Sequence, residues 1–144
     1  MKTTKWFIGI ILLSILLSSS KCSDDEGHKY IIISNQSDKT IVWQPRFFRI
    51  GATDEQYDCQ YVLGGSIHSN SSCKFDYDDR GNIWEVGLNT HCLQLILMDE
   101  DVYSQYYLES CDTFRKYVPI LHRYQLTLED LQRMNWTVIY PPEE

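Results

Sequence analysis

The sequence predicts an all-β fold: an antiparallel β-sandwich-like domain with one short C-terminal helix, behind an N-terminal signal peptide. Three observations carry this prediction. Short runs of β-branched and aromatic residues recur along the chain, and Gly, Asn, Asp and Pro separate them, which is typical of strands and turns. One segment, residues 127–135, combines helical spacing with a capping residue and predicts a helix. Residues 1–21 have the composition of an export signal.

The export signal begins with a basic end and continues with a short apolar run. Lys2 and Lys5 precede the apolar residues 6–17, and small residues follow them. The run is shorter than the roughly 20 apolar residues that a membrane-spanning helix needs. We therefore expect the chain to be exported.

The rest of the chain predicts a tether and a single domain. Residues 22–28 are polar and acidic, as in a short tether, and residues 29–144 have the length of one domain. Removal of the signal with its three lysines leaves 10 basic and 20 acidic residues, a net charge of −10. A surface of this sign repels phosphate backbones, so we expect no nucleic-acid partner.

The first strands are predicted as a hairpin over residues 29–44, because β-branched runs at 30–33 and 40–43 flank turn residues. Pro45 then limits the second strand to a sheet edge or a bend, since proline donates no ladder hydrogen bond. Three short strands and a turn are predicted next: residues 60–63, 66–68 and 74–77, with the turn at 78–82.

The second half of the chain is predicted to contain the central strand. Residues 93–98 form the most apolar segment after the signal peptide, and the acidic residues 99–101 form a turn behind them. Further strands are predicted at residues 83–88, 102–108 and 136–140. Three tryptophans are expected to fill the core: Trp43, Trp84 and Trp136.

One helix is predicted over residues 127–135. Thr127 can cap its start, and Asn135 suits its C-terminal end. Acidic residues lie in the first turn, where the helix dipole favours them, and apolar residues recur at helical spacing: Glu129 and Asp130, then Leu128, Leu131 and Met134. We expect this helix to cross over between the strands at 121–126 and 136–140.

Four cysteines after the tether predict two disulfides: Cys59, Cys73, Cys92 and Cys111. An even number in an exported chain favours bridges over free thiols. Three pairings are open, and the low entropic cost of short loops favours Cys59 with Cys73 and Cys92 with Cys111. Four buried free thiols are the alternative, because cysteine packs as a small hydrophobe.

Cys22 is the strongest candidate for chemistry. A cysteine directly after an export signal can receive diacylglycerol on its sulfur, and each buried methylene contributes about 0.8 kcal/mol to membrane binding. Residues 16–22 resemble the lipobox of bacterial lipoproteins, although Lys21 stands where a small residue is expected. The alternative is ordinary cleavage after Ser20, which would leave Cys22 near a free N-terminus.

Two further segments resemble lipoproteins of Bacteroidales. Residues 23–26, Ser-Asp-Asp-Glu, are similar to their acidic tether, which implies display on the outer face of the outer membrane. Residues 123–131 and 135–137 resemble the closing segment of small uncharacterised lipoproteins from these bacteria. The resemblance implies attachment to the membrane through an N-terminal lipid and implies no activity.

An acidic segment, residues 76–81, has part of a calcium-loop pattern. Arg80 stands at the fifth ligand position and Gly87 at that of the bidentate glutamate, so the segment predicts a hairpin turn instead of an EF-hand. A calcium site of another kind remains the alternative: Asp76, Asp78 and Asp79. We expect no other metal and no cofactor, because the His and Cys residues lack zinc-site spacing.

Neither a catalytic motif nor catalytic residues are predicted. Residues 64–68, Gly-Gly-Ser-Ile-His, lack the second glycine of a nucleophile elbow. Tyrosines beside turns and acidic residues can form a protein- or glycan-binding face instead: Tyr57, Tyr61, Tyr103, Tyr106 and Tyr107. Packing in the core is the alternative for these rings.

The sequence as a whole predicts a cell-envelope lipoprotein, anchored in the outer membrane and exposed at the cell surface. It would act as a non-catalytic binding or assembly module with a protein or glycan ligand. A soluble secreted or periplasmic β domain without lipid is the second interpretation. A small hydrolase is the third.

Overall fold

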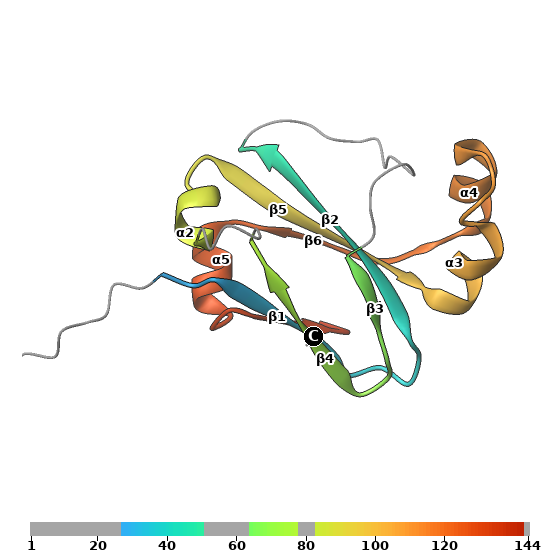
Figure 1. The fold of residues 1–144 in the computed structure, drawn as a ribbon, viewed down its shortest axis with the longest axis horizontal. Helices are drawn as coiled ribbons and strands as arrows, with labels where there is room; N and C mark the ends of the chain where they lie inside the picture. Colours follow the sequence, from blue (N-terminus) through green and yellow to red (C-terminus); the bar gives the residue numbers. More distant parts are fainter. Residues whose placement is uncertain (1–26, 51–63, 78–82, 143–144) are drawn as a thin grey trace, which may run out of the picture.

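Two β-sheets make up most of the fold, which we analysed in a computed structural model that describes residues 27–50, 64–77 and 83–142 (Figure 1). One sheet has the strand order β4–β1–β7 and the other has the order β3–β2–β5–β6. The strands are β1 (Tyr30–Asn35), β2 (Ile41–Arg49), β3 (Gly65–Ile67), β4 (Ser71–Asp76), β5 (His91–Asp99), β6 (Ile120–Leu126) and β7 (Thr137–Tyr140).

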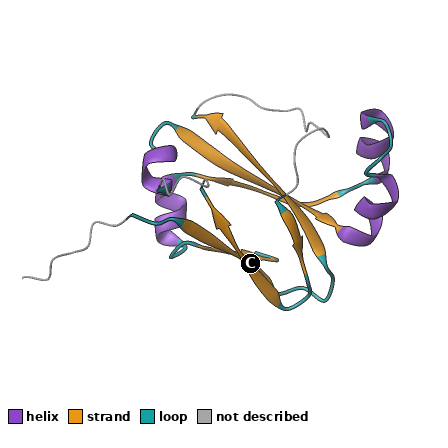
Figure 2. Cartoon of the chain, viewed as in Figure 1, coloured by secondary structure: helices purple, strands orange, loops and turns teal. Residues whose placement is uncertain are grey.

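Four short helices accompany the sheets in the described part of the chain (Figure 2). They are α2 (Trp84–Gly87), α3 (Glu100–Tyr106), α4 (Cys111–Tyr117) and α5 (Leu128–Arg133). The fold is therefore mostly β, as predicted. It contains more helix than the sequence indicated.

Several predictions concern residues outside the described ranges. These are the signal peptide and most of the tether, the strand at 60–63, the turn at 78–82, and the candidate residues Cys22, Cys59, Tyr57, Tyr61, Asp78 and Asp79.

One hydrophobic core cluster joins the two sheets. Ile31 and Ile33 of β1 and Val138 of β7 are fully buried and belong to the same cluster as residues of β2, β5 and β6. The cluster contains the three tryptophans that were predicted to be buried: Trp43, Trp84 and Trp136. Their exposed fractions are 3%, 0% and 8%.

The prediction of a central strand at residues 93–98 is confirmed. β5 lies between β2 and β6 and pairs antiparallel with both. Pro45 lies in β2 opposite Leu95, beyond the point where β3 stops pairing with β2 at Trp43. Among the described residues, the stretch of β2 that contains Pro45 therefore has a partner strand on one side only, as the sequence predicted.

The predicted hairpin over residues 29–44 is wrong. β1 and β2 belong to different sheets, and the turn between them takes the chain from one sheet to the other. Asn35, fully buried at the end of β1, holds this corner through its amide. Its Nδ2 donates to the carbonyl oxygens of Lys39 at 2.7 Å and Ile67 at 3.0 Å, and its Oδ1 accepts from the Ser37 hydroxyl at 2.7 Å.

The predicted strands at 83–88 and 102–108 are also wrong, because helices α2 and α3 occupy these segments. The acidic residues 99–101, predicted as a turn, form the cap and first turn of α3 instead. Asp99 is the N-cap residue, and its carboxylate accepts hydrogen bonds from the backbone N–H groups of Asp101 and Val102. α4 follows with its own cap, in which Ser110 accepts from the Thr113 N–H.

The predicted C-terminal helix is confirmed as α5, with both of its expected ends. Thr127 and Asp130 form a capping box at the start. At the other end Asn135 has a φ of 49°. The Trp136 N–H donates to the Leu131 oxygen and the Asn135 N–H to the Gln132 oxygen, which is the Schellman pattern. α5 connects β6 to β7 and is therefore the predicted crossover. β7 pairs with β1 in parallel, however, whereas the predicted fold is antiparallel.

Both preferred disulfide pairings are wrong, because Cys73 and Cys92 are free thiols. Cys92 lies near the start of β5, whereas Cys111 begins α4 beyond the other end of that strand. The length of strand between them is roughly 20 Å, and a disulfide needs Cα atoms within about 7 Å. Cys111 is disulfide-bonded.

Candidate functional site

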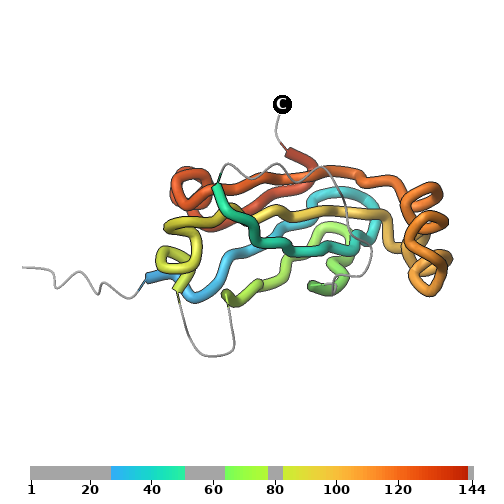
Figure 3. The backbone as a smooth tube through the Cα atoms, turned by 90° about the horizontal axis from the view of Figure 1, so that it is seen from above, coloured from blue at the N-terminus to red at the C-terminus, as the bar shows by residue number. Residues whose placement is uncertain are grey.

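Helices α3 and α4 form a pair at one end of the molecule, opposite the end where the described chain begins (Figures 1 and 3). The pair packs on the sheet through a second hydrophobic cluster. Its buried members are Val42, Ile96, Met98, Phe114 and Val118, and Val102, Tyr103, Tyr106 and Ile120 pack against them. The apolar faces of both helices are therefore used for attachment to β2 and β5.

An ion pair fixes the start of α3. The Lys39 Nζ lies 3.0 Å from the Asp99 Oδ2. The hydrogen bond from Lys39 is the largest cause that holds the pKa of the Asp99 carboxyl below its usual value, and it outweighs the opposing effect of burial. Asp99 is therefore charged at neutral pH, caps α3 and ties the helix to the connection between β1 and β2.

Four tyrosines gather on the helix pair and form what we call the tyrosine cluster: Tyr103, Tyr106, Tyr107 and Tyr117. The rings of Tyr103 and Tyr107 stack with centroids 6.1 Å apart. Those of Tyr106 and Tyr117 stack at 5.0 Å. Tyr107 and Tyr117 are 55% and 46% exposed, and Leu108 beside them is 82% exposed. The cluster thus presents large apolar surface to solvent.

A groove runs between α3 and the strands β2 and β3, next to the tyrosine cluster. It has a volume of about 320 Å³, in the range of small-ligand sites. Its lining residues are Val42, Gly65, Ser66, Glu100, Tyr103, Ser104 and Tyr107. Gly65 has a φ of 139°, a conformation that other residues rarely adopt, so a glycine is required on this side of the groove.

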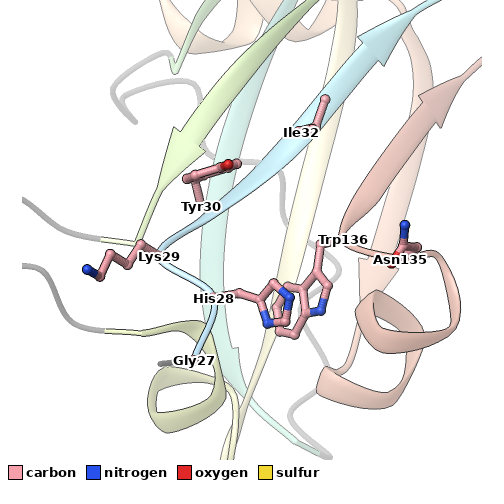
Figure 4. Close-up of a pocket in the computed structure, with 7 residues that line it drawn as sticks. All are labelled: Gly27, His28, Lys29, Tyr30, Ile32, Asn135 and Trp136. Atoms are coloured by element: carbon pink, nitrogen blue, oxygen red, sulfur yellow. The ribbon is translucent and has the colours of Figure 1, made fainter. Parts of the chain in front are cut away.

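A second pocket, of about 370 Å³, lies where the described chain enters the fold (Figure 4). In Figure 4 the His28 ring lies flat against the Trp136 indole; the ring centroids are 3.9 Å apart. The His28 backbone N–H and its Nδ1 both contact the Glu85 carboxylate, at 2.9 and 2.8 Å. These contacts close the end of the core and attach the incoming chain to α2, which is a structural role.

Two opposing effects set the pKa of the Glu85 carboxyl at this end of the core. Burial raises the pKa of the Glu85 carboxyl, but the hydrogen bonds and charge of His28 outweigh this and hold the pKa below its usual value. Nearby, the Lys74 Nζ lies 4.2 Å from the centre of the Tyr30 ring, a cation–π contact. The Glu85 carboxylate and the Lys74 ammonium group are therefore both engaged by contacts within the chain.

Of the predicted binding tyrosines, the structure brings together Tyr103, Tyr106 and Tyr107. Tyr117 of α4, which the sequence also places beside a turn, stacks on Tyr106. The structure adds Glu100 and Ser104, which the sequence did not indicate. The spacing of residues 100, 103, 104 and 107 is that of one helix face, so a helical interpretation of this segment would have found them. Tyr124, by contrast, is buried, and its hydroxyl donates to the Ile139 oxygen at 2.5 Å.

The remaining candidate residues do not form a further site in the described ranges. Asp76 is exposed at the end of β4, and no group of three or more His, Cys, Asp or Glu side chains in the described residues is placed to hold a metal ion. Ser66 lines the groove, whereas the His68 ring contacts the Thr40 hydroxyl at 3.5 Å.

Comparisons with known proteins add no assignment. No family model, no curated protein and no solved structure matches this chain. Among the described residues, none of the helices is long and apolar enough to span a membrane.

Proposed function

We propose that the chain is a cell-envelope lipoprotein whose β-sandwich-like domain serves as a non-catalytic binding module, with the tyrosine cluster as its binding face. The ligand is a protein or glycan of the envelope. A soluble secreted or periplasmic domain without the lipid is the alternative, and it would use the same face.

The observation that carries this proposal is the exposure of Tyr107 and Tyr117 on a helix pair whose apolar faces are already used for packing. Core packing explains Tyr124, which is buried and hydrogen-bonded. It does not explain two half-exposed rings next to Leu108. Tyrosines combine a large apolar ring with a polar hydroxyl and are enriched at binding surfaces.

The arrangement of the domain supports attachment through the N-terminus. The described chain starts at one end of the molecule, and helices α3 and α4 lie at the other (Figures 1 and 3). A lipid on Cys22, joined to the domain by the acidic tether, would leave the tyrosine cluster facing away from the membrane. A binding module at a surface needs this orientation.

Cross-linking on intact cells tests the binding face. The full chain is compared with the double variant Tyr107→Ala/Tyr117→Ala. Tyr30→Ala is the matched control, because Tyr30 is 40% exposed and lies on β1, far along the chain from the cluster. We expect the double variant to lose the cross-linked envelope components and the control to retain them. Equal yields from all three chains would contradict the proposal.

A further inference from the structure

We propose that the groove between α3 and β3 binds an alkylammonium group, either a lysine side chain or a quaternary ammonium headgroup. This inference rests on the proposed function, since the ligand would occupy one edge of the tyrosine cluster. It goes further by assigning the chemistry that the edge recognises.

One face of α3 supplies the recognition elements. Glu100, Tyr103, Ser104 and Tyr107 follow each other at intervals of three, one and three residues, so they project from the same side of the helix. All four line the groove, with Val42, Gly65 and Ser66 opposite them. The groove thus combines two tyrosine rings, one carboxylate and two serine hydroxyls.

The charge of the groove favours a cation. No Lys, Arg or His is among its lining residues. The neighbouring Asp99 carboxylate is neutralised by Lys39, whereas in the described part of the chain the Glu100 carboxylate has no such ion pair. A phosphate or carboxylate ligand would be repelled by Glu100 and by the overall net charge of −7.

The aromatic rings favour the same ligand class. The face of a tyrosine ring carries partial negative charge, and ammonium groups within about 6 Å of the ring centre are attracted to it. Among the described residues, this domain already uses that interaction at two places. The Lys116 Nζ lies 5.0 Å from the centre of the Tyr117 ring, and Lys74 lies over Tyr30.

The groove also has a suitable size. About 320 Å³ accommodates a small ligand group with its aliphatic chain. Tyr107 is 55% exposed, so a ligand that covers its ring removes apolar surface from water. Ser66 and Ser104 are exposed on the rim and can accept hydrogen bonds from a primary ammonium group.

An NMR titration of the full chain with Cys22→Ala, which keeps it in solution, tests the proposal. The cationic probes are choline and the methylamide of N-acetyl-lysine. Their controls are uncharged isosteres: the carbon analogue of choline with a tert-butyl group, and the methylamide of N-acetyl-norleucine. We expect at least one cation to bind about fivefold more tightly than its isostere, with shifts in residues that line the groove.

Variants localise the binding. Glu100→Gln and Tyr107→Ala should each weaken the preferred cation about three- to tenfold. Glu129→Gln removes the same charge from an exposed position on α5 and should leave the affinity unchanged. Preference for choline would assign a headgroup, and preference for the lysine derivative would assign a protein side chain.

Three results would overturn the inference. These are equal affinity for a cation and its isostere, affinity unaffected by Glu100→Gln and Tyr107→Ala, and no binding of either cation. If cross-linking through the tyrosine cluster persisted in any of these cases, the binding function would stand and only the ligand class assigned here would fall.

Discussion

Trp136 contacts three parts of the molecule: β1, α5 and the incoming chain at His28. Its carbonyl accepts from the Ile32 N–H of β1 at 2.9 Å, and its own N–H donates to the Leu131 oxygen of α5 at 2.8 Å. Its indole lies against His28 and is 8% exposed. Its φ of 59° is unusual for a bulky residue, so these contacts must hold it in place.

We predict that Trp136→Ala lowers the stability of the domain by about 3 to 5 kcal/mol, because it removes a large buried side chain from the core. Thermal denaturation should show a decrease in Tm of more than about 8 °C. Tyr107→Ala removes an aromatic ring from an exposed position and is the control, with little expected change. A Trp136→Ala midpoint equal to that of the wild type would place Trp136 outside the core.

The Lys39–Asp99 pair predicts a pH dependence. The pKa of Asp99 is lowered in the folded protein, so this pair stabilises the fold above the unfolded carboxyl pKa of about 3.9. The contribution is lost as the pH falls from there through the lower folded pKa. The pKa of Lys39 is raised, again mainly by its hydrogen bond to Asp99, so at the alkaline end the contribution is lost only above the usual pKa of 10.5.

Lys39→Met removes the charge and keeps the length of the side chain. Urea unfolding at a series of pH values should show the variant less stable than the wild type at pH 7. The two should converge in acid, once Asp99 is protonated in both. A stability difference that stays constant down to about pH 2 would show that the contribution of Lys39 is not electrostatic.

At the scale of single elements, helix α5 depends on a local device. The Thr127 hydroxyl accepts from the Asp130 N–H at 3.2 Å, and the Asp130 carboxylate accepts from the Thr127 N–H at 2.9 Å. The hydrogen bond from the Thr127 N–H is the largest cause that lowers the pKa of Asp130. The same helix directs the chain from β6 to β7, so its cap also supports the parallel pair of β1 and β7.

We predict that Thr127→Ala destabilises the domain by about 1 kcal/mol, since it removes one side of the capping box. Thr127→Ser retains the hydroxyl and should be close to the wild type. Denaturant unfolding measures both, with an unchanged slope expected for each. If alanine and serine were equivalent at this position, the cap would not contribute to stability.

Elements with local signals could be predicted, and those that depend on distant contacts could not. Both ends of α5 are marked in the sequence, by Thr127 and Asn135, and the apolar run of β5 identifies it without further information. Residues 102–108 predict a strand because Val and Tyr favour strands, whereas the structure forms α3 there. The Asp99 cap of α3 is a local helix signal, but the apolar face of the helix takes its partners, Val42 and Ile96, from other elements.

The hairpin error has the same physical cause. A buried strand, a polar turn and a second buried strand look alike whether the two strands pair or diverge into separate sheets. The choice is made by Asn35, whose amide reaches the carbonyl oxygen of Ile67 at 3.0 Å, 32 residues further along the chain. The sequence indicates the tyrosines of the tyrosine cluster as binding candidates by their residue type and their position beside turns. The role of Glu100 and the groove itself follow only from the orientation of α3 against β2 and β3.

At the scale of the whole molecule, the two ends have different roles. The end with the incoming chain is closed by the contacts of His28 with Glu85 and with Trp136. The end with α3 and α4 exposes Tyr107, Leu108 and Tyr117. A tethered binding module requires this arrangement, with its attachment at one end and its exposed aromatic surface at the other.

The last prediction concerns the tether. If Cys22 is lipidated, the full chain expressed in a suitable bacterium should partition into the detergent phase of a phase-separation extraction, whereas Cys22→Ala should stay in the aqueous phase. Two or more acyl chains provide enough buried methylene groups for stable anchoring, which a single chain does not. Lys21→Ala restores a small residue before the cysteine and should increase the detergent-phase fraction if Lys21 slows processing. Recovery of all three chains in the aqueous phase would favour the soluble domain and remove the membrane from the proposed function.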